Sequence, residues 1–488
     1  MPLNSQFVLG AGSDGQAVGQ PLRLANRHGL IAGATGTGKT VTLQRLIEGF
    51  SDAGVAVFAA DVKGDLCGLG AVGTPQGKIA ERIASMPWLA HQPTAYPLSL
   101  WDVHGQSGHP LRTTLSEMGP LLIGALLELT DSQQAALYAA FKVADREGLL
   151  LLDLKDLKAL LAHLKSHPEV LGEDSALFTS TSSQALLRKL AGLEQQGAEA
   201  LFGEPALQLE DLLHPDRDGR GRIHLLDASR LVHEAPKVYA TFLLWLLAEL
   251  FEQLPERGDA DKPVLALFFD EAHLLFADTP KALQERLEQV VRLIRSKGVG
   301  VYFVTQSPSD LPDEVLAQLG LRIQHGLRAF TAKEQKSLRA VAEGFRPNPA
   351  IDTLATLTEL GIGEALVGTL EEKGTPAMVQ RVAIAPPQSR IGPLSDSERV
   401  ALIRQSPLLG RYDKAIDRES AYELLSARAE QAKPAAAGKT AGIGSAAGDL
   451  LGGLAGQVLK STMRQAANQI GRQLVRGLLG SLLGGKGR

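Results

Sequence analysis

Short apolar runs alternate with segments of helical periodicity along most of the chain, and this alternation predicts the fold. A continuous apolar run of about four to eight residues suits a parallel strand that is covered on both faces. Helical segments between such runs are typical of a parallel sheet with helices on both sides. The sequence therefore predicts an α/β fold with a mostly parallel sheet, whose strands lie at residues 29–32, 55–60, 223–227, 263–269, 300–306 and 321–328.

Further apolar stretches extend this sheet at its margins. Residues 365–368 and 379–384 are interpreted as a closing hairpin, and residues 7–10 and 22–24 as edge strands. Long helices are expected directly after the first strand, at 237–252 and at 281–297, because apolar residues recur there at helical spacing.

Shifts in composition divide the chain into five segments. Residues 76–220 show no chemistry-bearing cluster, but they contain helical periodicities at 115–129, 132–147, 154–165 and 182–193. We predict a first part of the α/β core at 1–75, a mostly helical insertion at 76–220, a second part of the core at 221–385, a helical extension at 386–432 and a tail at 433–488.

The tail differs from the rest of the chain in charge. Residues 433–448 are rich in Ala, Gly and Lys and read as a linker, and apolar residues then recur at near-helical spacing to the end. From residue 433 on, eight Lys and Arg stand against one acidic residue, Asp449. A basic amphipathic helix of this type can self-associate, lie on a membrane surface or contact nucleic acid, and the sequence leaves these alternatives open.

Composition narrows the class of protein. The 488 residues carry a net charge of −4, so any nucleic-acid binding has to come from a local patch. Cys67 is the single cysteine, which excludes an internal disulfide and favours a reducing compartment. The first residues lack the pattern of a secretory signal, and the most apolar windows are shorter than the roughly 20 residues that span a bilayer. We therefore expect a cytoplasmic protein.

The glycine-rich turn after the first core strand carries the clearest motif. Residues 33–40 fit the P-loop pattern of a glycine, four free positions and then Gly-Lys-Thr. Glycines let the backbone wrap closely and aim its N–H groups at phosphate oxygens, and the following helix directs its positive end to the same place. The predicted nucleotide-binding residues are Gly33, Ala34, Thr35, Gly36, Thr37, Gly38, Lys39, Thr40 and Val41. Lys39 is expected to reach the β- and γ-phosphates of ATP, and the Thr40 hydroxyl to ligate Mg²⁺.

Two adjacent carboxylates follow the apolar strand at 263–269. Asp270 fits a Walker B carboxylate that holds Mg²⁺, and Glu271 fits a general base that polarises the attacking water. Gln306 ends a strand that we expect between the P-loop strand and the Glu271 strand, where an amide can contact the γ-phosphate. Asp61 and Lys63 follow another strand, and either a place near the nucleotide or a solvated loop fits them equally well.

Phosphoryl transfer also calls for an arginine, which a neighbouring subunit can supply in trans. Arg292 and Arg295 lie three residues apart on the helix before the Gln306 strand, and Arg322 and Arg328 lie beyond that strand. Each is an ordinary surface or salt-bridge arginine in the simplest interpretation. We select Arg295 first and Arg292 second as candidates for the trans arginine.

These motifs, taken in order, resemble the HerA/FtsK superfamily of P-loop ATPases. The resemblance rests on residues 33–40, on Asp-Val-Lys-Gly-Asp at 61–65, on Asp-Glu-Ala-His at 270–273 and on Thr-Gln-Ser-Pro at 305–308, and it is strongest to the carboxyl-terminal ATPase domain of HerA helicases. It covers roughly residues 20–75 and 220–385. The resemblance implies a RecA-like core, Mg²⁺-dependent ATP hydrolysis and a homo-oligomeric ring, commonly a hexamer. The insertion, the tail and the short lead-in before the P-loop strand depart from the family pattern.

Two functions follow from these observations. The first is an oligomeric ATPase motor that acts on DNA, as family members do. The second is an ATP-dependent switch or scaffold that acts on a membrane or a protein partner through the tail, without DNA. The two differ in whether DNA stimulates hydrolysis.

Overall fold

A computed structural model describes residues 6–258, 260–276 and 281–432 of the chain. Residues Met1–Ala427 form one compact unit and Arg428–Arg488 a second, of which residues 428–432 are described. The basic tail predicted at 433–488 lies outside the described residues. None of the helices in the described ranges is long and apolar enough to cross a membrane.

The described residues of the first unit are built on one sheet of twelve strands in the order β2-β1-β12-β11-β10-β3-β9-β8-β4-β7-β5-β6. The strands are β1 (Gln6–Gly12), β2 (Ala17–Pro21), β3 (Gly29–Ala32), β4 (Ala56–Asp61), β5 (Leu98–Asp102), β6 (His109–Pro110), β7 (Ile223–Asp227), β8 (Leu265–Phe269), β9 (Val299–Thr305), β10 (Leu321–His325), β11 (Glu364–Gly368) and β12 (Gln380–Ile384).

Strands β10 through β6 in this order run parallel, whereas β11, β12, β1 and β2 are antiparallel to their neighbours. The predicted mostly parallel α/β sheet and the closing hairpin are confirmed. Strand β9 lies between β3 and β8, as predicted for the Gln306 strand. The carboxyl ends of β3, β9, β8 and β4 therefore meet at one edge, where α/β proteins bind ligands.

Helices cover both faces of the sheet. They are α1 (Lys39–Asp52), α2 (Lys78–Ala84), α3 (Leu115–Leu126), α4 (Asp131–Glu147), α5 (Leu154–Ser166), α6 (Ser180–Gln195), α7 (Leu209–Leu213), α8 (Ser229–Glu234), α9 (Pro236–Gln253), α10 (Lys281–Ile294), α11 (Asp313–Leu316), α12 (Ala332–Glu343), α13 (Thr353–Glu359), α14 (Asp396–Gln405) and α15 (Ala421–Ala432). Local signals set their ends. Helix α4, for example, begins with a capping box between Thr130 and Gln133 and stops at Gly148, which adopts a left-handed conformation.

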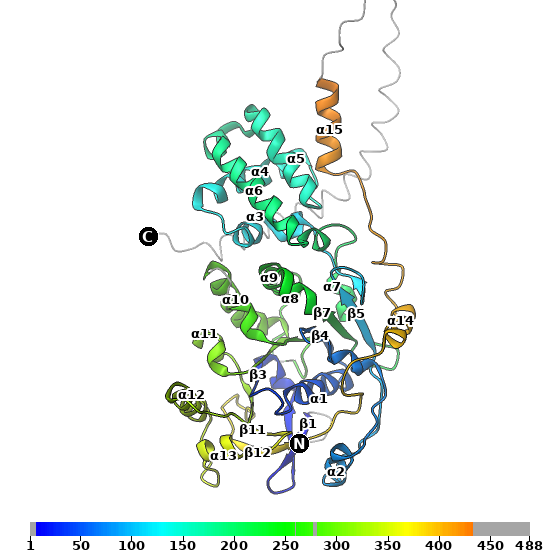
Figure 1. Cartoon of the computed structure of the whole chain (residues 1–488), viewed down its shortest axis with the longest axis vertical. Helices are drawn as coiled ribbons and strands as arrows, with labels where there is room; N and C mark the ends of the chain where they lie inside the picture. The colour runs from blue at the N-terminus through cyan, green and yellow to red at the C-terminus, as the bar shows by residue number, and fades with distance from the viewer. Residues whose placement is uncertain (1–5, 259, 277–280, 433–488) are drawn as a thin grey trace, which may run out of the picture. The chain divides into compact units, whose positions relative to one another are not determined.

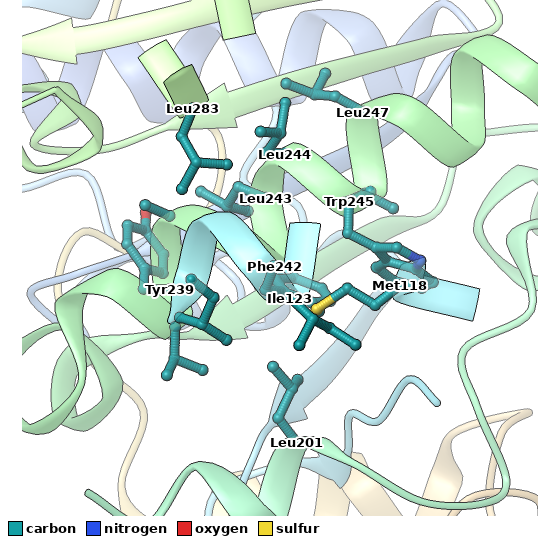
Figure 2. Packing of buried hydrophobic residues seen from close by; sticks show 14 of the residues in the cluster. Met118, Ile123, Leu201, Tyr239, Phe242, Leu243, Leu244, Trp245, Leu247 and Leu283 are labelled. Carbon is teal, nitrogen blue, oxygen red and sulfur yellow. The ribbon is translucent and has the colours of Figure 1, made fainter. Parts of the chain in front are cut away.

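The core has two main layers, one on each face of the sheet. Alternate residues of β3 enter different layers, since Leu30 and Ala32 pack on the side of α9 whereas Ile31 packs on the side of α1. This two-sided burial is the reason for the continuous apolar runs in the sequence. Helices α3–α6 lie beyond α9 and α10 (Figure 1), and Met118 of α3 packs in one cluster with Phe242 and Trp245 of α9 (Figure 2).

Three predictions differ from the structure. Residues 22–24 belong to a 3-10 helix, Leu22–Arg27, and not to a strand. Residues 7–10 lie in β1, which pairs with both β2 and β12, so the edge strand is β2 instead. Residues 76–220 are mostly helical, but they also contain β5, a fully buried strand that pairs in parallel with β7. We did not predict this strand, because the prolines on either side of β5 indicated a loop. The sheet therefore continues into the segment that we interpreted as an insertion.

Candidate nucleotide-binding site

The P-loop joins β3 to α1 at the carboxyl edge of the sheet. Gly33, Gly36 and Gly38 all have positive φ angles, of 152°, 79° and 107°, which L side chains rarely adopt. A Cβ on Gly33 would lie 2.5 Å from Cβ of His325, so close packing also requires glycine there. The glycines that the motif predicted are thus those that the backbone requires.

Lys39 lies buried beneath this loop. Its Nζ donates to the carbonyl oxygen of Gly33 at 2.6 Å and to that of Ala34 at 3.1 Å. Burial, followed by the nearby charge of Lys63, lowers the pKa of Lys39, and the carboxylates of Glu271 and Asp270 oppose this effect. A bound phosphate would offer the ammonium group a charged acceptor in place of two neutral ones.

His325, which the sequence analysis did not select, supports the P-loop from behind. Its Nε2 is 2.9 Å from Oγ1 of Thr42 in α1, and its Nδ1 is 2.9 Å from the carbonyl oxygen of Glu364. Burial lowers the pKa of His325 to about 4, so the ring is neutral at physiological pH. A neutral ring that donates from Nδ1 to the carbonyl leaves Nε2 to accept from Thr42. His325 therefore ties β10, α1 and β11 together around the loop.

The two carboxylates predicted after β8 are both present at the same edge. Asp270 is buried, and desolvation together with the charge of Glu271 raises its pKa to about 6, although Lys63 opposes the shift. Glu271 has a φ of 45°, an unusual angle for a residue with a side chain. This conformation turns Glu271 away from the direction that the strand would give it, and the two carboxylates can serve different roles.

Lys63 extends to the two carboxylates from the loop after β4. Its Nζ is 2.7 Å from Oε1 of Glu271. Burial works to raise the pKa of Glu271, but the hydrogen bond and charge of Lys63, with smaller contributions from His273 and Lys39, outweigh it and lower that pKa. Glu271 is therefore ionised near neutral pH. Asp61, at the end of β4, is buried beside these groups and anchors the loop that carries Lys63.

The donor set at this edge suits a magnesium ion. A carboxylate and a hydroxyl are hard oxygen ligands of the kind that Mg²⁺ prefers, and Asp270 and Thr40 supply them beside the P-loop. Burial raises the pKa of the nearby Asp65, and the charge of Lys63, with a smaller contribution from the Thr40 hydroxyl, opposes this rise. In the part of the chain that the structure describes, no three His, Cys, Asp or Glu side chains form a metal-binding group. An ion held by Thr40 and Asp270 would thus need phosphate and water as further ligands.

Gln306 follows the last residue of β9 and has an exposed side chain at the carboxyl edge. The neighbouring turn is built by Asp310, whose Oδ2 accepts from Oγ1 of Thr305 at 2.7 Å and from the backbone N–H of Ser307 at 2.9 Å. Gln306 is thus presented on a defined turn between the P-loop strand and the Asp270 strand.

The two predicted arginines lie at the opposite edge of the sheet. Arg292 and Arg295 come before Val299, the first residue of β9. They line a cavity of about 320 Å³ in which three further arginines take part, Arg27, Arg322 and Arg346. The seven residues of β9, at about 3.3 Å each, separate these arginines by about 20 Å from the P-loop edge. The structure of one chain therefore does not bring them to their own nucleotide site.

Comparisons with known proteins agree with this architecture. The family model described as "Helicase HerA-like C-terminal" matches residues 6–488. A solved structure of the bacterial conjugative coupling protein TrwBdeltaN70, in an unbound form, has a TM-score of 0.52 and 15% identity, and covers 78% of this chain and 91% of its own. The plasmid coupling protein TrwB in complex with the GTP analogue GDPNP has a TM-score of 0.51 and 16% identity, and the match covers 75% of this chain and 87% of TrwB. VirB4 of Thermoanaerobacter pseudethanolicus has a TM-score of 0.47 and 20% identity, with 81% and 98% covered. No curated protein matches the sequence.

Proposed function

Since the chain belongs to the helicase HerA-like C-terminal family, we propose that it binds ATP with Mg²⁺ and hydrolyses it to ADP and phosphate. The observation that carries this proposal is the meeting of Lys39, Asp270 and Glu271 at the carboxyl edge of one sheet. TrwB, which has a similar fold, binds a non-hydrolysable nucleoside triphosphate analogue, and this supports a nucleotide as the ligand.

Each side chain has a distinct role in the proposed reaction. The backbone N–H groups of the P-loop and the ammonium of Lys39 hold the phosphates and stabilise the negative charge of the transition state. The carboxylate of Glu271 accepts a proton from the water that attacks the γ-phosphorus, and ADP leaves with the bridging oxygen. Thr40 and Asp270 would hold Mg²⁺, which neutralises charge on the β- and γ-phosphates. We assign to Gln306 the role of orienting the water or the γ-phosphate.

We further propose that the protein acts as a homo-oligomeric ring in which arginines reach the nucleotide of the neighbouring subunit. Arg292 and Arg295 are exposed, and among the described residues their cavity is lined by five arginines and by no carboxylate side chain. Such a positively charged surface is suited to bind the phosphates of a nucleotide that a second chain holds. A ring brings the amino edge of one sheet against the carboxyl edge of the next, which completes each site.

Mixed oligomers test the trans arginine. Arg295→Ala alone and Lys39→Ala alone are each expected to lose most ATPase activity. Mixing the two should restore part of it, because an intact P-loop on the Arg295→Ala subunit then meets an intact arginine on the Lys39→Ala subunit. Mixing Arg295→Ala with a chain that carries both substitutions is the control and should restore nothing. If mixed oligomers form and stay inactive, Arg295 does not act in trans.

We propose DNA as the substrate on which the ring acts, in line with the family. Double-stranded DNA should then stimulate ATP hydrolysis, and the stimulation should weaken steeply between about 50 and 200 mM salt, because phosphate contacts release counterions. Steady-state ATPase assays with and without DNA measure this stimulation, and the Glu271→Gln variant gives the background rate of hydrolysis.

A second candidate function is an ATP-dependent switch or scaffold that acts on a membrane or a protein partner through the tail, whose eight basic residues stand against one acid. If this function is correct, DNA would leave the ATPase rate unchanged. Deletion of residues 433–488 would abolish sedimentation with anionic liposomes and would keep the hydrolysis rate. Hydrolysis that DNA stimulates, from a chain whose liposome binding does not depend on the tail, would contradict the switch or scaffold function.

A further inference from the structure

The loop after β4 holds Lys63 at a fixed place beside the carboxylates. Asp61 accepts backbone N–H groups from Lys63 at 3.1 Å, Gly64 at 2.8 Å and Leu66 at 3.0 Å, so its two oxygens shape the whole turn. Gly64 adopts a φ of 74°, as the tight turn requires. A loop that is fixed by three bonds to one buried carboxylate positions the side chain that it carries.

The ammonium of Lys63 binds the side chain to which we assign the role of base. It lies 2.7 Å from Oε1 of Glu271, and the side chains of Lys63 and Glu271 are 41% and 10% exposed. Oε2 of Glu271 lies 3.3 Å from Nδ1 of His273, yet this buried oxygen makes no hydrogen bond within the described residues. Lys63 therefore binds one of the two Glu271 oxygens that could accept a proton from water, and its positive charge offsets the negative charge of the carboxylate.

Lys63 is also close to the place of the phosphates. Its charge acts on Lys39 beneath the P-loop, on Asp270 and on Asp65. Lys39 and Lys63 thus belong to one cluster of charges although they extend from different loops, and the side chain of Lys63 is exposed enough to change its partner. A γ-phosphate carries more negative charge than a carboxylate and offers three oxygens to an ammonium group.

We infer that Lys63 exchanges partners during the ATPase cycle. When ATP binds, its ammonium leaves Glu271 for the γ-phosphate, and Glu271 becomes free to accept the proton of the attacking water. When phosphate departs, Lys63 returns to Glu271. This inference rests on the proposed function, and it gives the chain a second lysine that recognises the γ-phosphate and links its presence to the release of the base.

A binding experiment in the Glu271→Gln background isolates the proposed contact. That substitution removes the charge with which Lys63 pairs, so any remaining effect of Lys63 on affinity reports contact with nucleotide. We expect Lys63→Ala in this background to weaken ATP binding about tenfold, the effect of one charge-assisted contact, and to change ADP binding little. Lys63→Arg, which keeps the charge, should recover most of the ATP affinity. Lys262→Ala is the control, because Nζ of Lys262 hydrogen-bonds the carbonyl oxygen of Ala53, away from the site.

Isothermal titration with ATP and with ADP separates the outcomes. No loss for either nucleotide would overturn the inference, because Lys63 would then serve only to neutralise the charge of Glu271. An equal loss for both would overturn it as well, because Lys63 would then not recognise the γ-phosphate. In the chain with native Glu271, Lys63→Ala should lower kcat more than it raises the KM for ATP. A Glu271→Gln chain that binds neither nucleotide would instead contradict the proposed function itself.

Discussion

Replacing Glu271 with glutamine is expected to leave ATP bound and to slow its hydrolysis by about 10²- to 10⁴-fold, the usual contribution of a general base. Glutamine has nearly the same shape as glutamate, but its amide cannot accept the proton of the attacking water. The substitution leaves the P-loop and Lys39 unaltered, so they keep their contacts with the phosphates. It also removes the charge that pairs with Lys63. Single-turnover hydrolysis and an ATP-binding titration on the same preparation measure the two effects.

A matched substitution elsewhere shows whether the loss is specific. Glu256 is an exposed glutamate that pairs with Nζ of Lys297 at 3.1 Å and lies outside the site, so Glu256→Gln should hydrolyse ATP at the native rate. Because the φ of Glu271 is 45°, thermal unfolding of both variants should be compared to show that the turn is intact. Near-native hydrolysis by Glu271→Gln would show that another group is the base.

Much of the fold was predictable because hydrophobic pattern and topology agree. A parallel strand that is buried on both faces, such as β4 or β8, appears in the sequence as an unbroken apolar run. The expectation that the Gln306 strand lies between the P-loop strand and the Glu271 strand is confirmed by the position of β9. Strand β5 was missed, since a five-residue strand among prolines carries too little pattern to stand out.

The site was predictable where one short motif supplies all its members, and less so where distant segments meet. The P-loop needs only local sequence, and its glycines adopt the conformations expected of them. His325 is a single polar residue at the end of a strand, and nothing in its neighbours shows that it packs against Gly33. The Lys63–Glu271 pair depends on the adjacency of β4 and β8, which a sequence shows only through the complete strand order. The trans role of Arg295 depends on a second chain, and it remains a prediction.

Replacing Lys39 with alanine is expected to lower kcat/KM for ATP by about 10³-fold, which corresponds to about 4 kcal/mol of transition-state stabilisation. The loss should exceed that of any other single lysine, because Lys39 is buried beneath the loop and its ammonium has no substitute there. Lys63 extends from a different loop and contacts Glu271, so it does not occupy the place of Lys39 beneath the P-loop.

The Lys39→Ala substitution can affect both the stability of the fold and the binding of ATP, and the two effects need separate measurements. The alanine removes the hydrogen bond from Lys39 to the carbonyl oxygens of Gly33 and Ala34, although Oγ1 of Thr37 still donates to Ala34. It also removes a buried charge, whose desolvation is costly. These effects oppose each other, so we expect little change in the thermal unfolding temperature, and an unchanged unfolding curve with lost ATP binding would locate the defect in phosphate recognition. Lys262→Ala, on an exposed lysine, should retain both properties. If Lys39→Ala hydrolyses ATP as the native chain does, the phosphates do not bind at this loop, and the assignment of Asp270 and Glu271 fails with it.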